Sequence, residues 1–364
     1  MTDAAANGVE LERRPAKPRN GAPPSTIALA KRLGLRLVTT DALSIRRRRR
    51  GRGWIYLGVN DHVIRDPATV RRLARLAVPP AYHDVLYARD ASAHLQAIGR
   101  DAAGRLQYRY HPRWDDVREL RKARRLARLA DGLPRIHKSI GRYLAAGDES
   151  REFTCAAAIE LVARSAIRPG SESYVRLHGT RGAVTLLKSN VDIYGETVTL
   201  KFRSKGGKIV SKEFEAPRLA GAIALLRQLP GRRLFQYRTE TGDVRSVTAH
   251  EVNAFLRVIA GVKISLKDFR TLLASASVLD ALAHTTPAAS DRKRRKQVLE
   301  AVRAAADDLA NTPAICRKSY VNETVIAAFE EGVLERFSQT LKRCRSPASR
   351  AQVLAKILAA GADI

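Results

Sequence analysis

Residues 106–129 read LQYRYHPRWDDVRELRKARRLARL, and the pattern of the chain changes in the middle of this stretch. Up to His111-Pro112, apolar and polar residues alternate as they do in a half-buried β-strand. From Trp114 onward, apolar residues recur at spacings of three and four, which is typical of an amphipathic helix. Such a change marks a domain boundary. We therefore expect an α+β fold, in which a small, mostly β N-terminal domain over 51–120 precedes a mainly helical domain with a β insert over 121–364.

The domain before this boundary contains short strand patterns separated by turns. We expect strands over 54–59, 62–64, 84–88 and 106–110, with turns at 60–61 and 101–104. Asp66-Pro67 should begin a short helix that runs to Leu76, because aspartate accepts backbone hydrogen bonds at a helix start and proline fits the first turn.

The first 50 residues are expected to form a basic leader. Residues 1–24 are rich in Ala, Pro, Gly and charge and have no apolar period, so we predict that they are disordered. Residues 25–35 have the pattern of a short amphipathic helix. The run Arg46–Arg50, followed by Arg52, should repel itself and be mobile. Its interpretation stays open between an arm that grasps phosphates and a solvated segment without a specific role.

The second domain reads as helices interrupted by a β insert. We expect helices over 114–129, 136–144, 153–167, 217–228, 249–260, 268–279, 297–309 and 321–337, with a basic connector over 291–296. The insert should consist of strands over 183–187, 191–193, 197–202 and 209–214. A turn over 203–208 contains Gly206-Gly207, which is typical of a hairpin.

The composition points to a polyanionic partner. Lysine and arginine number 66 against 36 aspartates and glutamates, which gives a net charge of +30. A surface of this charge concentrates phosphates and gains free energy when their condensed counterions are released. Double-stranded DNA is therefore the expected partner, although an arginine-rich composition without a specific role would explain part of the excess.

Other classes of protein and site are not indicated. No apolar run of about 18 residues is present to span a membrane, and the N-terminus lacks a secretory signal, so we expect a cytoplasmic protein associated with the nucleoid. The three cysteines form no CxxC pair, and the eight histidines have no metal-ligand spacing. We expect no disulfide, no metal and no small-molecule cofactor.

Five segments carry most of the side chains that suggest chemistry. They are IGRDAAGRLQYRYHP (98–112), AIRPGSESY (166–174), KFRSKGGK (201–208), SLKDFRT (265–271) and NTPAICRKSY (311–320). In order and separation they resemble the type IB DNA topoisomerase family in its small bacterial and poxvirus form. The resemblance runs from about Gly51 to Phe337. Each segment alone is weak, but ordered agreement over several segments is specific.

The first segment resembles the family's "GRDxxGRxQYxYHP" signature, a strand that faces the DNA major groove. The resemblance implies that Gln107, Tyr108 and Tyr110 contact bases and backbone, while Arg100 and Arg105 hold phosphates. Amide side chains can read adenine edges, and basic ones fix the register on the duplex. Without the resemblance, the two tyrosines would be interpreted as ordinary strand residues that pack on a core.

The other segments imply a catalytic site built around one tyrosine. The resemblance assigns the nucleophile to Tyr320 and the two arginines that grip the phosphate to Arg168 and Arg270. It assigns a general acid to Lys205, with Lys208 as the rival, and gives supporting roles to Asn311, Lys267 and the DNA contact Tyr174. Asn311 stands where poxvirus relatives have a histidine, so it can donate a hydrogen bond but cannot carry a positive charge.

The implied reaction joins Tyr320 to a 3′ phosphate, lets the duplex rotate, and reseals the strand without ATP or metal. We expect a monomer that clamps around DNA. Two alternatives remain: a tyrosine recombinase, which usually has His-x-x-Arg where this chain has 267–270 KDFR, and a basic DNA-binding protein without catalytic activity.

Overall fold

The structure, a computed structural model, describes residues 25–344 and 347–360. It divides into two compact units, the first up to Arg118 and the second from Glu119 onward. Helix α3 (Trp114–Ala146) begins in the first unit and continues in the second. Within the described ranges, no helix is both long enough and apolar enough to cross a membrane.

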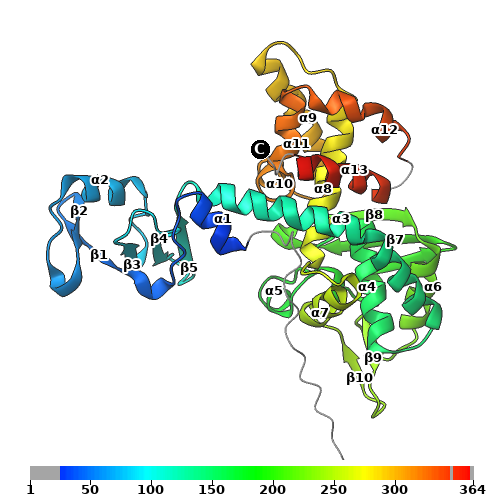
Figure 1. The fold of residues 1–364 in the computed structure, drawn as a ribbon. Helices are drawn as coiled ribbons and strands as arrows, with labels where there is room; N and C mark the ends of the chain where they lie inside the picture. The colour runs from blue at the N-terminus through cyan, green and yellow to red at the C-terminus, as the bar shows by residue number, and fades with distance from the viewer. Residues whose placement is uncertain (1–24, 345–346, 361–364) are drawn as a thin grey trace, which may run out of the picture. The chain divides into compact units, whose positions relative to one another are not determined.

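The first unit is built on a five-stranded antiparallel sheet, drawn in blue to cyan in Figure 1. Its strands lie in the order β2-β1-β3-β4-β5, so that β2 and β5 form the two edges. The bounds are β1 (Leu43–Arg50), β2 (Gly53–Leu57), β3 (His83–Ala88), β4 (Leu95–Arg100) and β5 (Leu106–Tyr110), with helices α1 (Thr26–Arg32) and α2 (Pro67–Arg75).

Both faces of this sheet are covered near its centre. Tyr56 and Tyr87 pack edge to face, at 5.5 Å between ring centroids, in a cluster that includes Leu73 of α2. A second cluster contains Leu43 and Leu95. Strand β4 is buried along nearly its whole length, so its sequence does not alternate, and for this reason it was not among the predicted strands.

Several predictions for this unit are confirmed. Strands occur at 84–88 and 106–110 as expected, and the strand predicted from residue 54 is β2. Asp66 caps α2 by accepting hydrogen bonds from the N–H groups of Ala68 and Thr69. The predicted return strand over 62–64 is wrong, because Val63 makes only an isolated bridge to Leu57.

The predicted leader over 1–50 is also wrong in its last part. Residues 43–50, which include most of the arginine run, form strand β1 in the interior of the sheet order. Alternation points Arg47 to the protein, where it donates to the carbonyls of Val78, Pro79 and Tyr82. These contacts offset the repulsion on which the prediction of mobility was based. The disorder predicted for 1–24 falls outside the described residues.

The second unit is mainly helical and carries a small sheet. Strands β6 (Val191–Tyr194), β7 (Thr197–Arg203) and β8 (Ile209–Glu215) form an antiparallel sheet, and β9 (Gln236–Arg238) pairs with β10 (Val244–Ser246). The helices after α3 are α4 (Arg151–Ser165), α5 (Glu172–His178), α6 (Pro217–Leu226), α7 (Ala249–Ala260), α8 (Leu266–Ala283), α9 (Asp291–Asp308), α10 (Pro313–Tyr320), α11 (Glu323–Glu330), α12 (Ser338–Lys342) and α13 (Pro347–Ala360).

Two buried helices organise this unit. Helix α4 contacts α6, α7 and α8, and α8 also contacts α9, α10 and α13. Nearly every residue of α4 is buried, and the small side chains of 156–158 allow its neighbours to approach closely. Because α4 and α8 are fixed by packing on several sides, residues near their ends are held in defined positions.

The predictions for this unit are largely confirmed, with four corrections. The helices predicted over 114–129 and 136–144 form one helix through Pro134, since burial of Leu133 and Ile136 offsets the proline's cost of about 3 kcal/mol. The predicted connector over 291–296 is the start of α9. The helix predicted over 321–337 ends at Glu330, and Gly332 follows with a left-handed backbone (φ 72°). The strand predicted over 183–187 is instead a single 3-10 turn over 183–185.

Candidate active site

Arg168 follows the end of helix α4, where Ala166 adopts a left-handed conformation (φ 53°). The backbone around Arg168 lies directly against Gly182: the Ala183 N–H donates to the Arg168 carbonyl at 2.8 Å. A Cβ on Gly182 would lie 2.4 Å from that same carbonyl oxygen. Only glycine permits this approach, so the backbone of Arg168 is held from two sides. The close packing also explains why residues 183–185 turn here and do not form a strand.

Arg270 is the largest fully buried side chain, with 2% of its surface exposed, and comes from the first turns of α8. Its guanidinium donates to the carbonyl of Ala166 and, at 3.2 Å, to that of Leu309. Its Nε is buried without a hydrogen-bond partner among the described residues. Burial lowers the pKa of Arg270, and the neighbouring Tyr320 opposes part of this shift.

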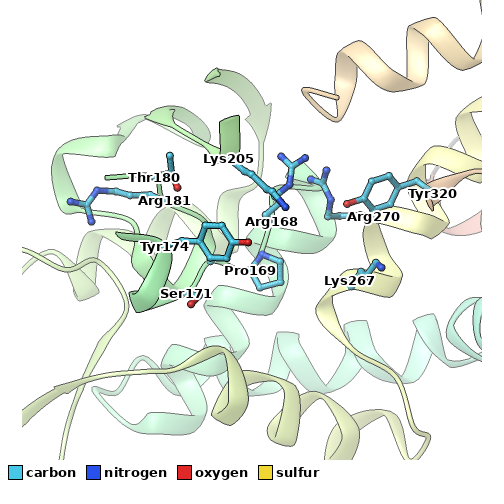
Figure 2. A pocket seen from close by; sticks show the side chains of 11 residues that line it. Arg168, Pro169, Ser171, Tyr174, Thr180, Arg181, Lys205, Lys267, Arg270 and Tyr320 are labelled. Carbon is cyan, nitrogen blue, oxygen red and sulfur yellow. The ribbon is translucent and has the colours of Figure 1, made fainter. Parts of the chain in front are cut away.

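Tyr320 is the last residue of α10 and is 9% exposed. The Arg270 guanidinium carbon lies 4.9 Å from the centre of its ring, and Figure 2 shows the hydroxyl pointing toward Arg270. Burial alone would raise the pKa of Tyr320, but the charges of Arg270, Arg168 and Lys267 outweigh it and lower the pKa below its usual value of 10.0.

The backbone of Tyr320 is fixed by two side chains that the sequence motifs did not indicate. The Ser275 hydroxyl of α8 donates to the Tyr320 carbonyl at 3.0 Å and accepts from the Asn322 N–H at 3.1 Å. The buried ammonium of Lys122 in α3 donates to the carbonyl of Val321 at 2.5 Å. Three segments far apart in sequence thus determine where the phenol lies.

Asn311 lies between α9 and α10 and is 8% exposed. Its carbonyl oxygen accepts a hydrogen bond from Arg168 Nη2 at 2.6 Å. Its Nδ2 is buried and has no partner within the described part of the chain. A buried donor without a partner costs about 1–3 kcal/mol, and an acceptor from outside the protein would offset this cost.

A cavity of about 360 Å³ is lined by Arg168, Arg270 and Tyr320, as Figure 2 shows. Arg168, Arg270, Lys205, Lys267, Tyr174 and Tyr320 line it, together with Pro169, Gly170, Ser171, Thr180 and Arg181. Lys205 comes from the turn between β7 and β8, and its Nζ lies 5.6 Å from the centre of the Tyr174 ring. The rival Lys208 is not part of the lining.

The structure therefore brings six of the predicted site residues to one cavity and links Asn311 to them through Arg168. Sequence reasoning missed Lys122 and Ser275, which act on the backbone and lie in ordinary helical patterns. It also missed Arg181, which lines the cavity and donates to the carbonyl of Thr185 at 3.0 Å.

The residues predicted to contact DNA in the first unit divide between the two faces of β5. Tyr108 and Tyr110 share one face, where their rings stack at 6.1 Å, and Arg118 lies over Tyr110 at 4.3 Å. Gln107 points to the opposite face, because neighbouring strand residues alternate, and donates to Asp101 at 2.9 Å.

The two arginines predicted to hold phosphates, Arg100 and Arg105, have partners within the protein. Arg105 also bonds Asp101, at 2.9 Å, while Arg100 donates to the carbonyl of Gly104. Neither bond is buried, so both side chains remain accessible.

The cavity has the chemistry of a site for a phosphodiester. Guanidinium groups hydrogen-bond phosphate oxygens in a fixed planar geometry, and two of them, those of Arg168 and Arg270, come from residues that line the cavity. A phenol with a lowered pKa lies beside these cations. Two lysines on the cavity wall, Lys205 and Lys267, are able to supply a proton to a leaving oxygen.

Comparisons with known proteins agree with this chemistry. Residues 112–346 match the family model for the eukaryotic DNA topoisomerase I catalytic core, and residues 53–101 match that for the bacterial DNA topoisomerase IB N-terminal domain. The chain is 28% identical over 293 residues to the DNA topoisomerase 1B of Acanthamoeba polyphaga mimivirus. The aligned region covers 79% of this chain and 87% of the relative. The first match alone spans more than half of the chain and decides against a tyrosine recombinase. The protein therefore belongs to the type IB DNA topoisomerase family.

Proposed function

We propose that this protein relaxes supercoiled duplex DNA by breaking and rejoining one strand through Tyr320. The observation that carries the proposal is the cavity that gathers Arg168, Arg270, Lys205 and Lys267 around Tyr320, a phenol whose pKa is lowered. A backbone phosphate in this cavity would supply acceptors for the cationic donors.

In this proposal the phosphate is held by Arg168, Arg270 and Asn311. In-line attack by the phenol develops negative charge on the oxygens that do not take part in bond breaking. Donors fixed in advance at these oxygens stabilise the transition state, each typically by about 3–4 kcal/mol. The hydrogen bonds that Arg270 makes to two carbonyls keep its guanidinium in place before the substrate arrives.

The reaction exchanges one phosphate ester for another. Tyr320 loses its phenolic proton to solvent and forms a bond from its oxygen to phosphorus, and the bond from phosphorus to the 5′ oxygen breaks. Lys205, assisted by Lys267, donates a proton to that oxygen, which would be a poor leaving group as an alkoxide. The products are a 3′-phosphotyrosyl linkage and a free 5′ hydroxyl.

Resealing follows the same path in reverse. While the nick is held, the downstream duplex rotates and loses supercoils, and the 5′ hydroxyl then attacks the phosphotyrosyl bond. Because the ester bond is conserved, the cycle requires no energy from ATP, and the arginines take the place of a metal ion in stabilising charge.

We also propose that a single copy clamps the duplex and that Tyr174 contributes a contact beside the cavity. Support comes from the presence of candidate contacts in both units: Tyr108 of β5 is 46% exposed in the first, and Tyr174 is 45% exposed in the second. Sedimentation with and without a short duplex tests the stoichiometry. A complex with two protein chains per duplex would contradict the clamp.

The test of the reaction is incubation of supercoiled plasmid with the protein in EDTA without nucleotide, followed by a denaturant quench. We expect relaxation, and we expect trapped protein attached to a 3′ end. Tyr320→Phe should abolish both and keep duplex binding, because only the nucleophilic oxygen is lost.

Tyr194→Phe is the matched control, since Tyr194 is 71% exposed and lies outside the cavity. It should relax plasmid like the wild type. Relaxation by Tyr320→Phe, or an adduct on a 5′ end, would contradict the proposal. A protein that binds DNA but never relaxes it would instead support a basic DNA-binding protein without catalytic activity.

A further inference from the structure

The arginine run forms the tip of a two-stranded ribbon at one edge of the first unit's sheet. Strand β1 pairs with β3 only from Leu43 to Arg46, whereas its pairing with β2 continues to Arg50 opposite Gly53. Beyond Arg46 the two strands β1 and β2 therefore extend past their neighbours as a hairpin, which we call the basic ribbon (residues 47–56). It is visible as the β1–β2 hairpin in Figure 1.

One face of the basic ribbon is anchored to the protein. The Arg47 guanidinium lies 4.1 Å from the centre of the Trp54 ring and donates hydrogen bonds to three backbone carbonyls of the segment after α2. These bonds hold the base of the ribbon in a fixed orientation. The basic ribbon is thus an ordered element held by specific contacts, unlike a disordered charged segment.

The opposite face carries cations without partners. Arg48 and Arg50 point to the same side because they are two residues apart in a strand, and Arg52 follows in the turn. All three are exposed, and none has a hydrogen bond or ion pair among residues 25–344 and 347–360. Their cross-strand neighbours, Ile55 and Gly53, are not acidic. By contrast, Arg46 at the base pairs with Asp61 at 2.6 Å.

A row of like charges held in register is unfavourable unless something outside the protein neutralises it. Residues two apart in a strand are spaced by about 6.8 Å, so the row presents successive guanidiniums that can each grip a separate phosphate. A two-stranded ribbon also fits the width of the DNA major groove, which is about 12 Å. Duplex DNA satisfies both the charge and the shape.

We propose that the basic ribbon is a second DNA contact, which grips backbone phosphates through Arg48, Arg50 and Arg52 irrespective of base sequence. It lies at the β2 edge of the sheet, whereas the strand to which the family resemblance assigns DNA contact, β5, lies at the other edge. Four strand spacings separate the two edges, which is about 19 Å. That distance corresponds to about six base pairs along a duplex at 3.4 Å per step.

The experiment measures duplex binding as a function of salt. The substitutions Arg48→Gln, Arg50→Gln and Arg52→Gln are combined in a Tyr320→Phe background, so that no covalent adduct forms. The matched control combines Arg65→Gln, Arg71→Gln and Arg75→Gln, which remove the same charge from exposed positions of the same unit. Dissociation constants on a 30-base-pair duplex are determined between 50 and 200 mM salt.

The ribbon variant should bind with a shallower salt dependence. Each lost phosphate contact reduces the slope of log K against log salt by about 0.9, so three contacts predict a reduction of about 2.7. The control triple should reduce the slope by much less. Replacing the three ribbon arginines by lysine, which keeps the charge, should restore most of the slope, and thermal unfolding checks that each variant is folded.

An unchanged slope in the ribbon variant, or an equal reduction in both triples, would overturn the proposal, since the latter would show only an effect of net charge. Failure of this test is distinguishable from failure of the proposed function. The readout is binding, and it does not depend on whether Tyr320 forms an adduct.

Discussion

Replacement of Asn311 by aspartate tests whether a phosphate binds beside Arg168. The carbonyl oxygen of Asn311 accepts from Arg168 at 2.6 Å, while its buried Nδ2 has no partner. Aspartate has nearly the same shape and keeps the acceptor for Arg168. It replaces the unpartnered donor with a second oxygen, however, and adds a negative charge to the site.

The expected loss has two parts. Removing one preorganised donor costs about 3–4 kcal/mol of transition-state stabilisation. A carboxylate about 5 Å from a phosphate charge adds a repulsion of about 3 kcal/mol at an effective dielectric constant of about 20. Asn311→Ala removes the donor without adding charge, and it also removes the carbonyl oxygen that accepts from Arg168. It should therefore slow cleavage by at least about 10²–10³-fold. Asn311→Asp should be slower than Asn311→Ala by a further factor of about 10², since each 1.36 kcal/mol is tenfold.

The assay is single-turnover cleavage of a labelled duplex at saturating protein. The substrate is designed so that the leaving strand dissociates, and the covalent adduct is counted after denaturing quenches. Asn190→Asp is the control for net charge, because Asn190 lies outside the cavity, where it bonds the Leu187 N–H and the Lys201 carbonyl. It should stay close to the wild-type rate.

The relative cleavage rates of Asn311→Asp and Asn311→Ala test the reasoning. A cleavage rate for Asn311→Asp equal to or above that of Asn311→Ala would refute the reasoning, because a carboxylate next to a bound phosphate must repel it and slow cleavage. Thermal unfolding of each variant separates loss of chemistry from loss of fold.

Three further predictions follow from the same geometry. Because Arg270, Arg168 and Lys267 together outweigh burial and lower the pKa of Tyr320, the cleavage rate should rise with pH as the phenolate forms and level off below pH 10; a midpoint above 10 in a pH–rate profile would contradict this. Lys122→Met removes a buried charged donor worth about 1.5–3 kcal/mol, so we expect a lower Tm and slower cleavage with unchanged duplex Kd, and a change in Kd alone would argue against a positioning role. In Gly182→Ala the new Cβ would lie 2.4 Å from the Arg168 carbonyl, so overpacking of about 1–3 kcal/mol should lower Tm and disable cleavage; wild-type cleavage would show that this contact does not position the arginine.

The candidate site was predictable where its residues stand in recognisable sequence motifs. Arg168, Arg270 and Tyr320 stand in short motifs whose order carried the prediction, and the structure brings them to one cavity. Lys122 was not predictable, because its contact to the Val321 carbonyl joins positions 199 residues apart. Ser275 is a small polar residue in a helix, and nothing in its neighbourhood indicates which backbone it will bond.

The fold was predictable for elements whose apolar pattern reflects one buried face and one exposed face. Helix α7 has the expected bounds, because one of its faces is buried and the other is exposed. The arginine run was misjudged because local charge favours mobility, whereas tertiary contacts of Arg47 favour a strand. Strand β4 was missed because a strand covered on both faces shows no alternation.

Helix α8 carries both Arg270 and Ser275, so one helix holds an arginine of the cavity and the backbone of the tyrosine. Any tilt of this helix must displace the two together. In the proposed reaction, nicking and resealing cross the same barrier in opposite directions, so a tilt that raises this barrier should slow both by one common factor. The fraction of protein molecules joined to a nicked strand then stays constant while the turnover rate falls. A mutation that tilts this helix should therefore lower the turnover rate without increasing the amount of nicked DNA.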